Sequence, residues 1–396
     1  MANPSSSGAT RAACLLAGVE FFFALSWVVY VIFLPELLAR GGVDKRYLPW
    51  LIAADQLIFA LADWSMGVAV DRARSALRRI GPMLVLLSAV SALAMLLLPW
   101  LAVAPLFFLL ATGIWVATSA ALRAPPYVLL SRYAGRATLP RLAGIQLLGL
   151  ALASALAPYL AITLKGVDPV LPFLLSALAV GVSALALVYV ERRLPDAVAS
   201  PVATGDGYAP HSSYASRTGW AFLLLLALLL GFGQQVHTVI NSASQFKRLA
   251  DPEFLPWLMP VFWVGFSFGL LGVGRWIRAR GSLHVLQVAS VLGALALAGS
   301  ALAVSLVALV ASQFVAGLFW GFILCASIGV AGERGFPLQT GRNTGALMAT
   351  LAVATFSRIG LAVSGGAAAA GTVLLDWLPV ALWCLVAVIL RRTRAV

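Results

Sequence analysis

The stretch that decides the fold is "LADWSMGVAVDRARSALRR", residues Leu61 to Arg79. It places an acid, Asp63, inside an apolar run and follows that run with several arginines. A charged side chain at the centre of a membrane helix costs at least about 2.5 kcal/mol, so an acid in this position indicates a function. Arginines directly after an apolar run mark the point where a chain leaves the bilayer.

The composition of the whole chain is that of a membrane protein. Hydrophobic residues make up 62% of the 396 residues and charged residues 10%, whereas about a quarter of the residues in soluble domains are charged. A spanning helix needs about 20 mainly apolar residues. The sequence has twelve such segments and predicts an all-α polytopic protein; they are 12–34, 48–70, 81–99, 102–122, 142–164, 169–190, 219–241, 256–274, 283–302, 304–330, 344–366 and 371–390.

The net charge of +13 is explained by orientation in the membrane. The termini and the even-numbered connections hold 20 of the 27 Lys and Arg residues, the odd-numbered connections hold six, and Arg358 lies within a span. The positive-inside rule therefore predicts cytoplasmic termini in a bacterial-type inner (plasma) membrane. The polar start of the chain lacks the features of a removable signal peptide. No basic block alternates with aromatic residues, which argues against a nucleic-acid partner.

The chain divides into two similar parts. Residues 191–218 are rich in Pro, Gly, Ser and Ala, a composition typical of a flexible cytoplasmic linker. We therefore predict one six-helix bundle over residues 1–190 and another over 219–396. Glycine followed by an arginine cluster occurs after the second span and again in "GVGRWIRARGS", residues 272–282. This internal echo indicates pseudo-symmetric bundles.

The connection after the second span resembles the signature of the major facilitator superfamily. That signature is a glycine, three residues, an aspartate and then basic residues, supplied here by Gly67, Asp71, Arg72, Arg78 and Arg79. The resemblance implies two bundles around a central site and a gating role for this loop. A glycine there allows two helices to approach closely, and the aspartate can hold an arginine or a helix end across the interface.

Three stretches resemble one branch, the glycoside, pentoside and hexuronide:cation symporters, which include melibiose permease. They are "ADWSMGVAVDRARSALRR" (62–79), "RAPPYVLLSRYAGRATLPRL" (123–142) and "TGRNTGALMATLAVATFSRIGLAVSGG" (340–366). The chain departs from that branch at three positions. Trp64 stands in place of a proline, Phe59 in place of the second acid of the sodium site, and Arg123 in place of an acid.

Three carboxylates within spans are candidates for ion coupling. Glu20 and Asp63 lie at similar depths, about 12 and 10 Å from the cytoplasmic face, and the resemblance aligns Glu20 with an acid that contacts sugar hydroxyls. Two nearby carboxylates in a low dielectric cannot both stay ionised cheaply, so one can load and release a proton. Asp55 lies nearer the outer face. The alternatives are a structural contact for Asp63, a shallow position for Glu20 and a gate contact for Asp55.

Four further polar residues are candidates for the substrate cavity. Gln234, His237 and Asn241 follow at i, i+3 and i+7, one face of an α-helix. Such a face suits a hydroxyl-rich ligand, and the histidine can alternatively relay protons or form a structural bond. Arg358 needs a carboxylate partner, Asp55 or Asp63, or an anionic group of the substrate.

Five aromatic residues lie within spans rather than at their ends, and their rings can stack on a sugar or serve as packing. They are Trp27, Tyr30, Trp115, Trp263 and Trp320.

The sequence favours a proton-coupled symporter of a small polar solute, with a proton as the coupling partner. The stretch "GLALASALAPYLA" (149–161) resembles a motif of proton-coupled drug exporters. Export of drugs or other hydrophobic compounds is therefore an alternative function. A membrane assembly factor or receptor that has lost transport is a third reading. No enzyme motif occurs in a plausible setting, and we expect no cofactor or metal. The three cysteines, Cys14, Cys325 and Cys384, are expected to be buried apolar residues.

Overall fold

The structure is a computed structural model that describes residues 4–72, 80–133, 139–193, 219–335 and 339–395. Within these residues twelve helices are long and apolar enough to cross a membrane, which confirms the twelve predicted segments. Apolar runs form helices in a bilayer because each backbone polar group then finds its partner within its own segment.

We call the first six spans the first bundle. They are α1 (Pro4–Arg40), α2 (Leu48–Arg72), α3 (Ile80–Leu101), α4 (Pro105–Tyr133), α5 (Leu139–Thr163) and α6 (Val170–Arg193).

The remaining six spans form the second bundle, and two of them are interrupted. One consists of α8 (Trp220–Gln235), a π-helix η5 (Val236–Asn241) and α9 (Ser242–Lys247), and the next of α10 (Leu255–Leu258) and α11 (Pro260–Arg280). The others are α12 (Ser282–Leu302), α13 (Leu306–Gly335), α14 (Thr340–Val363) and α15 (Gly366–Ala395). Most of the predicted linker, 194–218, lies outside the described residues, so its bounds stay a prediction.

Glycines in the left-handed region fix two sharp changes of direction. Gly281, with a φ of 81°, separates α11 from α12, and Gly371, with a φ of 71°, kinks α15 near its start. Side chains disfavour this conformation, so glycine is the residue that fits it. The last span begins at Gly366 in the structure, before the kink, whereas the predicted segment begins at residue 371.

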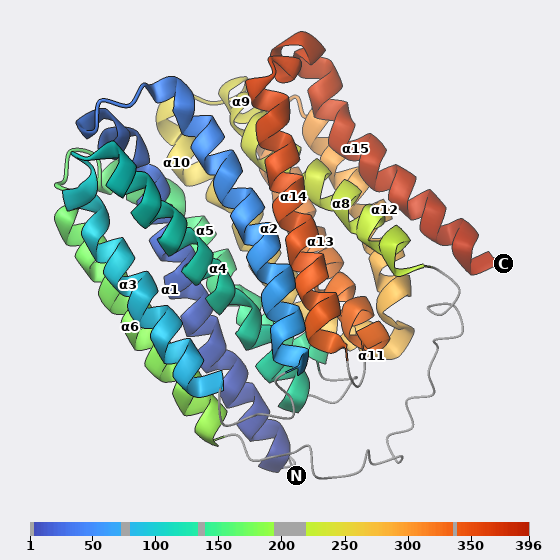
Figure 1. Cartoon of the computed structure of the whole chain (residues 1–396). Coiled ribbons are helices and arrows are strands. Elements are labelled where there is room, and N and C mark those ends of the chain that lie inside the picture. The colour runs from blue at the N-terminus through green and yellow to red at the C-terminus, as the bar shows by residue number, and fades with distance from the viewer. Residues whose placement is uncertain (1–3, 73–79, 134–138, 194–218, 336–338, 396) are drawn as a thin grey trace.

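The two bundles meet along α2 and α14, which lie side by side at the centre of the molecule (Figure 1). A second contact between the bundles joins α5 to α11. We call the face at which α1 begins the terminal face. At that face α2 ends and α14 begins, so the signature stretch of the sequence lies directly at the junction of the bundles.

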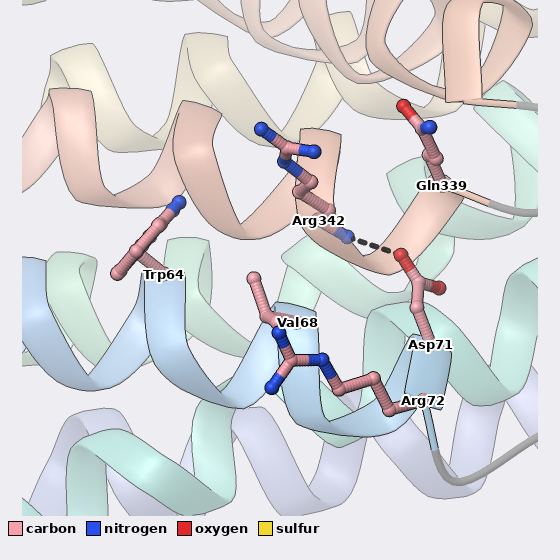
Figure 2. A pocket seen from close by; sticks show the side chains of 6 residues that line it. All are labelled: Trp64, Val68, Asp71, Arg72, Gln339 and Arg342. Carbon is pink, nitrogen blue, oxygen red and sulfur yellow. Dashed lines mark hydrogen bonds between the residues drawn. The ribbon is translucent and has the colours of Figure 1, made fainter.

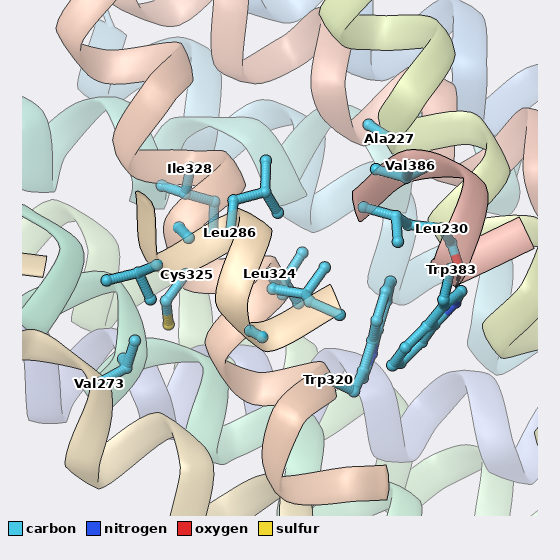
Figure 3. Packing of buried hydrophobic residues seen from close by; sticks show 14 of the residues in the cluster. Ala227, Leu230, Val273, Leu286, Trp320, Leu324, Cys325, Ile328, Trp383 and Val386 are labelled. Atoms are coloured by element: carbon cyan, nitrogen blue, oxygen red, sulfur yellow. Dashed lines mark hydrogen bonds between the residues drawn. The ribbon is translucent and has the colours of Figure 1, made fainter. Parts of the chain in front are cut away.

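The second bundle has a large apolar core (Figure 3). Trp320 of α13 stacks on Trp383 of α15 with ring centroids 5.9 Å apart, and Cys325 is buried elsewhere in the same cluster. The prediction of buried cysteines holds for Cys325 but is wrong for Cys14 and Cys384, which are exposed on the outer faces of α1 and α15. Lipid provides an apolar environment for a thiol as readily as the protein core does.

Candidate functional site

A cluster of aromatic rings surrounds one acid inside the first bundle. The rings of Trp27 and Tyr30 of α1, Phe59 of α2 and Trp115 of α4 have centroids 4.7 to 5.9 Å apart. The Tyr30 hydroxyl donates a hydrogen bond of 3.0 Å to Asp55 Oδ2, and Asp55 is only 1% exposed. Three predicted cavity residues and one predicted coupling acid therefore lie together, brought there by three different helices.

Several buried polar atoms of the first bundle, one of them in this cluster, have no partner within the described part of the protein. These atoms come from three helices. They are Trp115 Nε1 and Thr112 Oγ1 on α4, the hydroxyls of Ser88 and Ser91 on α3, and both side-chain amide atoms of Gln146 on α5. A buried polar atom without a hydrogen bond costs about 1–3 kcal/mol. Water or a bound polar molecule would lower this cost by hydrogen bonding to these atoms.

The other two coupling acids are also buried. Glu20 of α1 is 5% exposed and Asp63 of α2 is 0% exposed, and each takes part in a hydrogen bond or another electrostatic interaction. The shallow position considered for Glu20 stays an alternative, because burial within the protein does not give a depth in the membrane. The coupling role of both residues stays a prediction.

Arg358 of α14 is half-buried without a carboxylate partner among the described residues. It makes no ion pair there with Asp55 or Asp63, and its Nε atom has no hydrogen-bond partner. The structural pairing considered from the sequence is thus not present. A cation in this position is available to an anionic ligand or to water.

A continuous hydrogen-bonded chain occupies the interior of the second bundle. His237 Nε2 lies 2.9 Å from Gln313 Oε1, an acceptor, so this nitrogen carries a proton. Gln313 donates to Gln245 Oε1 over 3.0 Å, and Gln245 donates to Asp376 Oδ1 over 2.8 Å. Arg248, half-exposed at the end of α9, closes the chain with an ion pair of 3.3 Å to Asp376.

The predicted polar face of the seventh span is altered by the π-helix. The α-helix ends at Gln235, so the register that would place Gln234, His237 and Asn241 on one α-helical face does not continue. Gln234 donates to Thr238 within the span, and Asn241 donates to the Leu375 carbonyl of α15 over 2.6 Å. All three residues are buried and bonded to protein groups.

The two remaining aromatic candidates pack within the second bundle. Trp320 belongs to the core described above, and Trp263 of α11 contacts the rings of Phe262 and Phe266 edge-on. These contacts account for both side chains without a ligand.

The signature loop closes the junction of the bundles at the terminal face. A Cβ atom at Gly67 would collide with the Gly341 carbonyl, and one at Gly345 would collide with the Asp63 carbonyl. The close packing of α2 against α14 therefore requires glycine at these positions. Asp71 accepts hydrogen bonds from the backbone N–H groups of Gly341 (3.0 Å) and Arg342 (2.7 Å). This is the contact with a helix end that the sequence predicts; Figure 2 shows its surroundings.

Two parts of the predicted site need separate mention. Arg78 and Arg79 of the gating loop lie outside the described residues. Among the described residues no group of three or more His, Cys, Asp or Glu side chains could hold a metal ion. The neutral amides Gln146, Gln245 and Gln313 were missed from the sequence. A search of the predicted spans for amides as well as charges would have found Gln146 and Gln313, whereas Gln245 lies beyond the predicted end of the seventh span.

The structure resembles transporters of known structure over nearly its whole length. The human organic anion transporter MFSD10 matches with a TM-score of 0.74 and 14% identity, over 98% of this chain and 100% of that one. A bacterial homologue of the iron transporter ferroportin, outward-facing, matches with a TM-score of 0.71 and 15% identity, over 98% and 100%. The E. coli fucose:proton symporter matches with a TM-score of 0.70 and 13% identity, over 96% and 98%.

No protein-family model and no curated protein sequence matches the chain. At identities this low, structural similarity is a statement about fold. The chain therefore has the fold of the major facilitator superfamily, twelve membrane-spanning helices in two six-helix bundles.

Proposed function

We propose that this protein is a secondary active transporter that moves a small polar solute together with a proton. The fold it shares with transporters supports movement of a solute by alternating access, in which two bundles rock around a central site. The observation that carries the proposal is the buried pair of Tyr30 and Asp55 within an aromatic cluster that also contains an unpaired indole N–H.

The aromatic cluster suits a ligand with both an apolar face and hydroxyl groups. Trp27 and Trp115 are nearly parallel, with an angle of 11° between their ring planes, and flat ring faces stack on the C–H faces of sugars. Asp55 and Tyr30 offer an acceptor and a hydroxyl, and Trp115 Nε1 offers a donor. A glycoside-like solute, as in the symporter branch that the sequence resembles, is the first class to test.

Asp55 is the acid that we place first for proton coupling, with Asp63 and Glu20 beside it. A hydrogen bond of 3.0 Å from the Tyr30 hydroxyl orients its carboxylate. Protonation would weaken that bond and free Tyr30 to turn toward a ligand.

The terminal face is cytoplasmic in this proposal, because of its excess of arginines. Opening toward the cytoplasm then requires α2 to separate from α14, which breaks the Asp71 bonds to Gly341 and Arg342. The signature loop thus acts as the cytoplasmic gate.

The experiment is uptake by purified protein in proteoliposomes, with a panel of neutral sugars that includes fucose. Wild type is expected to accumulate one of them when the inside is made alkaline. Counterflow exchange needs no net proton movement, so Asp55→Asn should keep exchange and lose accumulation. Asp63→Asn and Glu20→Gln, measured in parallel, show which acid carries the proton.

Two outcomes would contradict the proposal. Accumulation that ignores the pH gradient would remove proton coupling. Full accumulation in all three acid variants would remove these carboxylates from the mechanism. An entrapped pH dye gives an independent readout, since sugar addition should acidify the lumen only when a coupled proton enters.

A second candidate substrate, an organic anion, is favoured by Arg358. This cation has no carboxylate partner among the described residues, and a substrate carboxylate would supply one. Counterflow with a panel of monocarboxylic and dicarboxylic acids tests it. Arg358→Gln should abolish exchange of an acid and leave exchange of a neutral sugar unchanged.

A further inference from the structure

A groove lies at the terminal face beside the junction of α2 and α14, apart from the aromatic cluster. It has a volume of about 410 Å³ and is lined by Trp64, Val68, Asp71, Arg72, Gln339 and Arg342. Figure 2 shows that the side chains come from both bundles, with Trp64, Val68 and Arg72 on α2 and Arg342 on α14. The groove exists only where the two bundles meet.

The groove is positively charged. Both carboxylate oxygens of Asp71 accept hydrogen bonds from backbone N–H groups at the start of α14. Its negative charge therefore stabilises the N-terminal end of that helix. The guanidinium of Arg342 makes no ion pair within the described residues, and its side chain is exposed. Arg72 points into the same space and is itself engaged in a hydrogen bond or electrostatic interaction. The available charge is therefore greatest at Arg342.

The groove lies across the boundary between apolar and polar parts of the chain. The apolar span of α2 ends at Ala69, so Trp64 and Val68 lie within it while Asp71 and Arg72 lie beyond it. Above the groove, Leu57, Leu61 and Trp64 are 44%, 68% and 50% exposed and follow at i, i+4 and i+7 on one face of α2. Tryptophan at such a boundary is typical of the level of lipid headgroups.

We propose that this groove binds one anionic phospholipid, with its phosphate at Arg342 and Arg72 and an acyl chain along Leu61 and Leu57. Basic pockets between membrane helices bind anionic headgroups in this way. The lipid contacts both bundles at once, so it binds the form in which the terminal face is closed more tightly than the form in which it is open. Anionic lipid thus stabilises the closed terminal face.

The test is the melting temperature of the full-length protein in a neutral detergent, titrated with short-chain phosphatidylglycerol. Short-chain phosphatidylcholine and sodium phosphate are titrated in parallel. We expect phosphatidylglycerol alone to raise the melting temperature. In Arg342→Gln the concentration needed for half of the shift should rise about fivefold, the effect of one basic side chain near an anionic lipid.

The matched control is Arg278→Gln. Arg278 is exposed in the last turn of α11, outside the groove, so this variant should respond to phosphatidylglycerol as wild type does. Arg342→Lys keeps the charge and should restore most of the response if Arg342→Gln alone melts at a lower temperature.

Three results would overturn the proposal. An equal response to phosphatidylcholine would remove the need for an anionic headgroup. A response to sodium phosphate alone would indicate a site for small anions. An unchanged response in Arg342→Gln, or an equal loss in Arg278→Gln, would place the lipid elsewhere. None of these measurements depends on transport, so the lipid site can fail while the transporter proposal stands.

Discussion

The interiors of the two bundles differ in how their polar atoms are satisfied. In the second bundle, His237, Gln313, Gln245, Asp376 and Arg248 form a chain in which each member bonds to the next. In the first bundle, five buried side chains have polar atoms with no protein partner among the described residues: Ser88, Ser91, Thr112, Trp115 and Gln146. In the second bundle, the Nε atom of Arg358 is likewise without a hydrogen-bond partner among these residues.

Hydrogen-bond satisfaction can therefore distinguish buried polar groups with a structural role from those with a ligand-binding role. A satisfied group stabilises the fold, whereas an unsatisfied one destabilises it unless a ligand or water binds there. We therefore propose that the first bundle contributes the aromatic cluster to the solute site and that the polar chain of the second bundle is structural. Matched substitutions in the two bundles test this assignment.

The largest difference is expected between two glutamines. Gln313→Leu leaves His237 and Gln245 without their partners, at about 1–3 kcal/mol for each buried group. Gln146→Leu removes a side chain with no protein partner within the described residues, so stability should stay equal or rise. Thermal unfolding in detergent measures both. Equal losses in the two variants would contradict the assignment.

A smaller difference is expected between two tryptophans. The Trp383 indole donates a hydrogen bond of 3.0 Å to the Leu230 carbonyl, whereas Trp115 Nε1 has no partner among the described residues. Replacement by phenylalanine removes a similar volume in both cases. Trp383→Phe should therefore cost about 1 kcal/mol more of unfolding free energy than Trp115→Phe, the size of an interhelical hydrogen bond in membranes. A larger cost for Trp115→Phe would reverse the comparison.

The smallest difference is expected between two threonines. The Thr238 hydroxyl donates to the Gln234 carbonyl over 2.9 Å, and the Thr112 hydroxyl has no partner among the described residues. Thr238→Val should lower the unfolding free energy by about 0.5 kcal/mol, while Thr112→Val leaves it unchanged. Repeated melts on a shared preparation resolve such a difference, and a stable Thr238→Val with an unstable Thr112→Val would speak against the account.

Much of the fold could be predicted from the sequence. Apolar runs of about 20 residues predict spans without any tertiary information. In lipid the backbone N–H and C=O groups have to bond to each other, and within one segment a helix achieves this. A close helix approach at Gly67 and a helix-end contact for Asp71 were expected from the sequence, and the structure identifies α14 as the partner of both.

The pairings inside the bundles could not be predicted in this way. Tyr30 and Asp55 meet because of the rotation of α1 against α2, and His237, which lies in the π-helix of the seventh span, meets Gln313 of α13. Helix rotation is set by packing along the whole interface, which a single sequence does not reveal. The site residues were therefore found as separate candidates, and their grouping came from the structure.

The most direct test of the central assignment is the thermal shift that a transported solute causes in the two tryptophan variants. The account predicts that a solute identified by counterflow raises the melting temperature of wild type and of Trp383→Phe by similar amounts, and that the shift is greatly reduced in Trp115→Phe. A full shift in Trp115→Phe together with a lost shift in Trp383→Phe would place the solute in the second bundle and contradict the account.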